Sequence, residues 1–119
     1  MDKETEIKLI RRIRLWKHSP ILVIRPAIVC VLLCLEIQDL SPEEMSPFLE
    51  CGSNSKLRCG ATNYLLENEY ISEKIVNEVK VKKRFSINPK GNAFLEKAKL
   101  LEPDLLEARE KMFQKNKNG

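Results

Sequence analysis

The stretch from Ser41 to Gly91 constrains the fold most, because several local signals follow one another there in a clear order. Its first residues, SPEE, combine a capping serine, a proline suited to the first helical position and two glutamates, which is a typical helix start. Cys51-Gly52 supplies a turn in which glycine is free to take a positive φ, and a second helical segment follows. Two strand-like segments then lead to Asn88-Pro89-Lys90-Gly91. The order predicts helix, turn, helix and a two-stranded hairpin.

The first helix of this pair has an apolar face made by Met45, Phe48 and Leu49. Pro47 lies inside it, lacks a backbone N–H and clashes with the preceding turn. We therefore expect the helix to be kinked or very short.

The second helix is predicted to bury Leu57, Ala61, Tyr64 and Leu65 and to turn its polar side chains outward. Arginine and lysine suit guanine, asparagine suits adenine, and serine and threonine suit phosphates, so such a helix can read DNA. The same residue types on a surface helix can also be merely solvated. The candidate DNA-reading residues are Ser53, Asn54, Ser55, Lys56, Arg58, Thr62 and Asn63.

Two strands are expected over Tyr70–Val76 and Val79–Asn88, with a bulge near Lys82-Lys83. Basic residues crowd the second strand, and lysines there can simply protect an exposed sheet edge from aggregation. In a helix-turn-helix with a wing, the same residues contact phosphates. The candidate wing contacts are Asn77, Lys80, Lys82, Lys83 and Arg84.

The flanking segments are predicted to be mainly helical. The first helix, residues 2–17, carries an apolar stripe with Ile7, Ile10 and Ile13, beside which basic residues are solvated. The short apolar run 21–24 is a strand or a buried linker, and 26–38 is apolar all round, as in a central core helix. Cys30 and Cys34 are expected to be core residues of that helix.

A further helix is expected over 92–101, with Ala93, Phe94, Ala98 and Leu101 buried, and a last amphipathic helix follows it.

The overall composition excludes several classes of protein. A chain of 119 residues, 43% apolar and 32% charged, fits one globular domain with a net charge of +4. The apolar run 27–35 is too short to cross a bilayer, and no signal peptide is visible, so we expect a cytoplasmic protein with reduced thiols and no membrane contact. With one histidine, no CxxC pair, no phosphate loop and no nucleophile motif, we expect no metal, no cofactor and no enzyme.

The sequence resembles the winged-helix core of MarR-type transcriptional regulators over about residues 21–101. The resemblance is carried by PAIVCVLLCLEIQDLSPEEM, by LLENEYIS and by the closing sequence Phe85-Ser86-Ile87-Asn88-Pro89-Lys90-Gly91. The chain departs from the family in having Glu69 where a glycine precedes the first strand, and in lacking an Asp-x-Arg element in the wing.

The resemblance implies an α+β, mainly α, single domain with a winged helix-turn-helix core and terminal helices, about 3–17 and 103–115, that form a homodimer. It implies a repressor that binds double-stranded DNA, a small-molecule effector between the terminal helices and the core, and oxidant sensing through Cys59. A winged-helix assembly module, or a plasmid or phage partition protein, are the alternatives. The candidate dimerisation residues are Ile7, Ile10, Leu105, Leu106, Met112 and Phe113.

Overall fold

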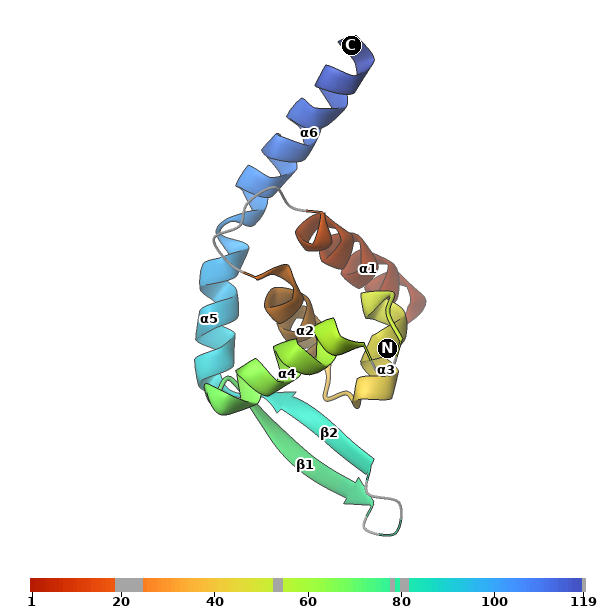
Figure 1. Cartoon of the computed structure of the whole chain (residues 1–119), viewed down its shortest axis with the longest axis vertical. Helices are drawn as coiled ribbons and strands as arrows, with labels where there is room; N and C mark the ends of the chain where they lie inside the picture. The colour runs from red at the N-terminus through yellow and green to blue at the C-terminus, as the bar shows by residue number, and fades with distance from the viewer. Residues whose placement is uncertain (19–24, 53–54, 78, 80–81, 119) are drawn as a thin grey trace.

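The computed structural model describes residues 1–18, 25–52, 55–77, 79 and 82–118, so the apolar run 21–24 lies outside the described residues. Within them, six helices and one two-stranded sheet follow the predicted order and confirm the α+β, mainly α, class (Figure 1). The elements are α1 Lys3–Lys17, α2 Pro26–Ile37, α3 Pro42–Leu49, α4 Lys56–Glu67, β1 Ile71–Asn77, β2 Lys82–Ile87, α5 Pro89–Lys99 and α6 Glu102–Asn118.

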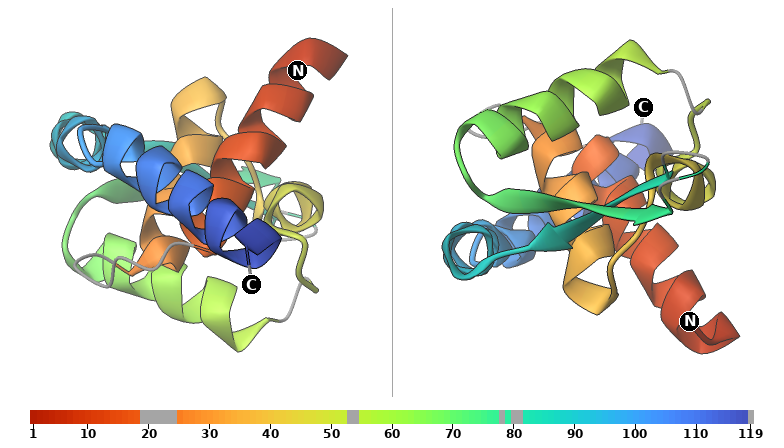
Figure 2. Two further views of the ribbon diagram at one scale, coloured as in Figure 1. Left: turned by 90° about the horizontal axis from the view of Figure 1, so that it is seen from above. Right: turned by 90° about the horizontal axis from the view of Figure 1, so that it is seen from below.

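Helix α2 is the centre of the core, as its apolar sequence predicts. Every residue from Ile28 to Leu35 is buried, and α1, α3, α4, α5 and β2 all pack against it (Figure 2). Cys30 and Cys34 are confirmed as core residues, and burial raises the pKa of each thiol to about 12.

The capping box predicted at the start of α3 is confirmed. The Glu44 backbone N–H donates to Ser41 Oγ at 3.2 Å, and the Ser41 N–H donates to Glu44 Oε1 at 3.1 Å. Helix α3 has 8 residues and contains Pro47, so it is short as expected. The left-handed residue after it is Glu50, at φ 53°, and the expectation of a positive φ at Gly52 was wrong.

The wing is an antiparallel hairpin in which Ile71 pairs with Ile87 and Glu73 with Phe85. Its irregularity lies between Ile75 and Asn77, opposite the step from Lys83 to Lys82, so the extra residue belongs to β1 and not to β2 as predicted. Leu40 adds a short bridge to the other edge of β2, where its N–H and C=O both bond to Phe85.

Helix α5 begins earlier than predicted, because Asn88 caps it and Pro89 is its first residue. The buried side of α5 is formed by Gly91, Leu95 and Ala98, whereas Ala93 is exposed and was wrongly placed in the core. Glu69, the residue standing where the resemblance leads one to expect glycine, has φ 61°, so the backbone keeps the left-handed turn without a glycine.

The two terminal helices meet through the first turn of α6. Leu105 is buried there, and Glu102 accepts hydrogen bonds from Arg12 Nη2 at 2.6 Å and from Trp16 Nε1 at 3.4 Å. Beyond this contact α6 extends away from the other helices (Figure 1). The whole chain, α6 included, measures 58 × 27 × 26 Å along its principal axes. Leu105 is therefore part of the chain's own core, and its prediction as a dimerisation residue was wrong.

Candidate nucleic-acid interface

The buried side of helix α4 agrees only in part with the prediction: Ala61 and Leu65 are buried as expected, but their neighbours in the core differ. Arg58 and Thr62 are buried, at 6% and 4% exposure, together with Ala61 and Leu65. Tyr64, expected in the core, is 38% exposed. The predicted outward placement of Arg58 and Thr62 is therefore wrong.

The burial of these two polar side chains has a physical reason. The Thr62 hydroxyl donates within its own helix, where the carbonyl oxygens of Arg58 and Cys59 lie 3.0 Å away. Arg58 is buried along most of its length and brings Nη2 to 3.4 Å from Cys59 Sγ.

The face of α4 that remains accessible carries Lys56, Asn63, Tyr64 and Glu67, all exposed. Cys59 and Gly60 lie between them and are partly exposed, as is Ser55 before the helix, whereas Ser53 and Asn54 lie outside the described residues. Because residues 56, 59, 60, 63 and 67 are separated by three or four positions, they form one stripe along the helix. We refer to Lys56, Cys59, Gly60, Asn63 and Glu67 as the α4 face.

The basic residues of β2 do not form one surface, because neighbouring residues of a strand point to opposite sides. Lys83 lies on the side of the buried Phe85, where its Nζ is 3.0 Å from Glu73 Oε1. Arg84 lies on the other side and forms an ion pair with Glu44. Lys80 and the side chains of Asn77 and Lys82 lie outside the described part of the chain.

Lys74 is a basic residue of the wing that the sequence analysis missed. It stands directly opposite Arg84 in the hairpin and is exposed, so two cations share the outer side of the sheet. Its strand is mixed in composition, and only the pairing register reveals this placement.

The predicted dimerisation residues differ in exposure. Ile7 and Leu106 are about half exposed, at 49% and 51%. Leu100 beside α6, which was not among the predicted residues, is 77% exposed. Ile10 is half-buried, and the side chains of Met112 and Phe113 lie outside the part that the structure describes.

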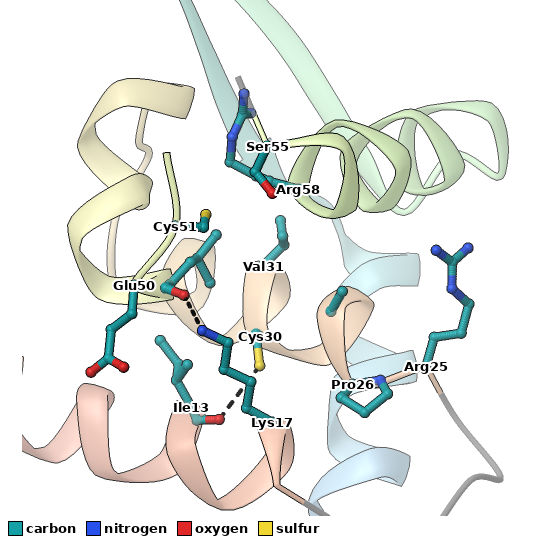
Figure 3. A pocket seen from close by; sticks show the side chains of 12 residues that line it. Ile13, Lys17, Arg25, Pro26, Cys30, Val31, Glu50, Cys51, Ser55 and Arg58 are labelled. Carbon is teal, nitrogen blue, oxygen red and sulfur yellow. Dashed lines mark hydrogen bonds between the residues drawn. The ribbon is translucent and has the colours of Figure 1, made fainter. Parts of the chain in front are cut away.

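A pocket of about 420 Å³ opens between α1, the start of α2 and the connection from α3 to α4 (Figure 3). Its wall is largely apolar, with Cys30 and Val31 from the central helix. Lys17 donates to the Leu49 carbonyl oxygen at 2.7 Å, and Arg25 stands at the opposite side of the pocket. The pocket thus lies between a terminal helix, α1, and the helix pair α3–α4.

Other chemistry finds little support in the described residues. No group of three His, Cys, Asp or Glu side chains among them is arranged to hold a metal ion. In the same part of the chain, no helix has both the length and the apolar composition needed to cross a membrane.

The fold has a counterpart among solved structures. A mutant of ZitR from Lactococcus lactis superposes with a TM-score of 0.59 and 14% sequence identity, covering 97% of this chain and 85% of the ZitR chain. The chain has a winged-helix fold. Family models and curated sequences were also compared, and none matches.

Proposed function

We propose that this chain is a DNA-binding transcriptional regulator that acts as a homodimer and represses transcription. The observation that carries the proposal is the winged-helix fold, which the ZitR mutant shares over 97% of this chain. In this fold the second helix of the pair and the wing are the elements that approach DNA.

The α4 face would enter the major groove. Asn63 is the best candidate for base recognition, since an exposed asparagine can bond adenine N6 and N7 together. Lys56, at the start of the helix, suits guanine or a phosphate. Lys74 and Arg84 on the outer side of the wing would contact phosphates.

Dimerisation would place two such helices on one duplex. Ile7, Leu100 and Leu106 are large apolar side chains left exposed near the terminal helices, and a second copy would cover them. Two recognition helices about 34 Å apart fit two half-sites separated by one helical turn. A dimer bound over a promoter would exclude the polymerase.

A selection from random duplexes tests the proposal. The purified chain is expected to enrich a pseudo-palindromic site, whose affinity falls steeply with salt. Asn63→Ala should weaken binding to that site about fivefold or more, since one bidentate base contact contributes about 1–3 kcal/mol. Thr62→Val, one residue away but buried, is the matched control and should change affinity less than about twofold. Absence of duplex binding at low salt would contradict the proposal.

Sedimentation tests the dimer separately. Leu106→Glu places a charge on the proposed interface and should shift the chain toward monomers, whereas Ala93→Glu on an exposed site of α5 should not. Equal behaviour of the two variants would contradict an interface at α6.

A winged-helix assembly module is the second candidate function. It is favoured by the exposed Ile7, Leu100 and Leu106, and by the ion pairs that occupy Lys83 and Arg84. Changing Lys82, Lys83 and Arg84 together to Glu separates the candidates. Loss of DNA retardation with an intact oligomer supports the regulator, and unchanged binding places any DNA contact elsewhere.

A small-molecule effector belongs to the same proposal, with the pocket of Figure 3 as its site. Ala27 lines the pocket and is half-buried, so Ala27→Leu would reduce its volume. Small aromatic and aliphatic acids that raise the Tm of the wild-type chain should fail to do so in this variant. An equal shift in both proteins would place the ligand elsewhere.

A further inference from the structure

An ion pair joins the helix pair to the wing. Arg84 of β2 meets both carboxylate oxygens of Glu44 from α3, with Nε 3.2 Å from Oε1 and Nη2 3.5 Å from Oε2. The two side chains are 47% and 39% exposed, so an external ligand can reach the pair. This is the forked geometry with which arginine binds planar anions.

Glu44 is held in place independently of Arg84. Its Oε1 accepts the Ser41 N–H at 3.1 Å as part of the capping box, which fixes the carboxylate at the start of α3. That backbone hydrogen bond is the main reason why the pKa of Glu44 lies below its ordinary value, and Arg84 contributes to the same direction. Glu44 is therefore a fixed negative charge at neutral pH.

Two neighbouring cations, Arg84 and Lys74, favour a ligand with more negative charge than the single carboxylate of Glu44. Lys74 stands directly across the hairpin from Arg84, so two positive charges lie on one side of the sheet and only one acid, Glu44, forms an ion pair with Arg84 among the described residues. A DNA phosphate offers the guanidinium the same two-oxygen geometry as the carboxylate. It also belongs to a strand of dense negative charge.

We propose that Glu44 competes with DNA phosphate for Arg84. In the free chain Glu44 holds the guanidinium, and on DNA the guanidinium transfers to a phosphate while Glu44 stays in its capping box. The Glu44–Arg84 ion pair therefore weakens DNA binding, because a phosphate must attract Arg84 more strongly than Glu44 does before the wing binds DNA. This inference rests on the proposed DNA-binding function.

Glu44→Gln tests the competition with the fold preserved, because glutamine at the same position also completes a capping box. Glu43→Gln is the matched control: it removes one charge from the same exposed turn and leaves the pair with Arg84 intact. In about 50 mM salt, Glu44→Gln should tighten binding to the selected duplex about three- to fivefold. Glu43→Gln should tighten it less than about twofold, through reduced repulsion alone.

Arg84→Gln completes a double-mutant cycle with Glu44→Gln. In that background, Glu44→Gln should have no more effect than Glu43→Gln, because the contested cation is gone. On the wild-type chain, the Arg84 Nε–H resonance should shift when duplex is added, a measurement that needs no variant.

Three results would overturn the inference while leaving DNA binding intact. They are equal effects of the two glutamate substitutions, weaker binding by Glu44→Gln, and an Arg84 resonance that DNA does not move. Weaker binding would mean that Glu44 positions Arg84 for DNA instead of withholding it. A wild-type chain that binds no duplex would overturn the proposed function itself, and with it this inference.

Discussion

The closing segment Asn88–Gly91 and the α4 face use their residues for different purposes. In the closing segment, Asn88 Oδ1 accepts the Gly91 N–H at 2.8 Å and caps α5. The Asn88 side-chain amide also donates to the Glu69 carbonyl oxygen. Lys90 donates to the Asn68 carbonyl oxygen at 2.8 Å and lies 5.0 Å from the centre of the Tyr70 ring. The segment ties the end of α4 to β1 and α5.

The α4 face has few such tasks. Lys56 and Asn63 are exposed, and among the described residues outside α4 itself, a Cβ built on Gly60 meets only the Arg25 guanidinium within 4 Å, at 3.9 Å. The buried side of α4 already supplies its packing through Ala61 and Leu65. Side chains that do not stabilise the fold are free to be selected for binding, which is why we propose this face for recognition. The residues of the closing segment, in contrast, stabilise the fold.

Gly91→Ala should have the largest effect on stability. A Cβ at this position would lie 2.1 Å from the Tyr70 carbonyl oxygen and 2.9 Å from Ile87 Cγ1, and backbone cannot move aside cheaply. We expect the free energy of unfolding to fall by about 3 kcal/mol or more, measured by urea denaturation. Gly52→Ala is the control, since a Cβ there meets no atom of the described, non-adjacent residues within 4 Å. Equal losses in both variants would contradict a packing role for Gly91.

Asn88→Ala should cost less, about 1–2 kcal/mol, because it removes the cap of α5 and leaves the Gly91 N–H without that acceptor. Asn88→Asp keeps the capping oxygen but loses the donor to Glu69, so it should recover most of the stability. Thermal unfolding of the three proteins measures this order. If Asp were as damaging as Ala, the bond to Glu69 would be the important one.

Local sequence pattern predicted the cap of α3 and the core helix of this molecule, but not the register of the wing. Capping residues act on their own backbone neighbourhood, so SPEE and the central apolar helix were interpreted correctly from local pattern. The wing was predicted as a hairpin, but the pairing of Lys74 with Arg84 depends on a register that local pattern does not specify.

The errors on α4 and α6 have a different physical origin. Treating polar side chains as outward-facing missed Arg58, which is buried, and Thr62, whose hydroxyl bonds its own helix. For Leu105, an apolar stripe predicts burial without saying whether the partner is the same chain or a second copy. The DNA contacts themselves remain predictions.

Gly60→Ala should have the smallest effect on stability, and in the opposite direction. Gly60 is inside α4 and its φ is negative, and the nearest atom to a new Cβ is at ordinary contact distance, so alanine should fit without strain. We expect the free energy of unfolding to rise by about 0.5–1 kcal/mol, because alanine has the higher helix propensity. Urea denaturation measures the gain, and a loss would mean that this face packs more tightly than the contacts indicate.

Duplex affinity measured on the same Gly60→Ala variant tests whether the α4 face needs glycine for DNA binding. A stabilised chain with weakened DNA binding would mean that glycine at this position lets the backbone approach DNA closely, so that a residue unfavourable for the helix is kept for the interface.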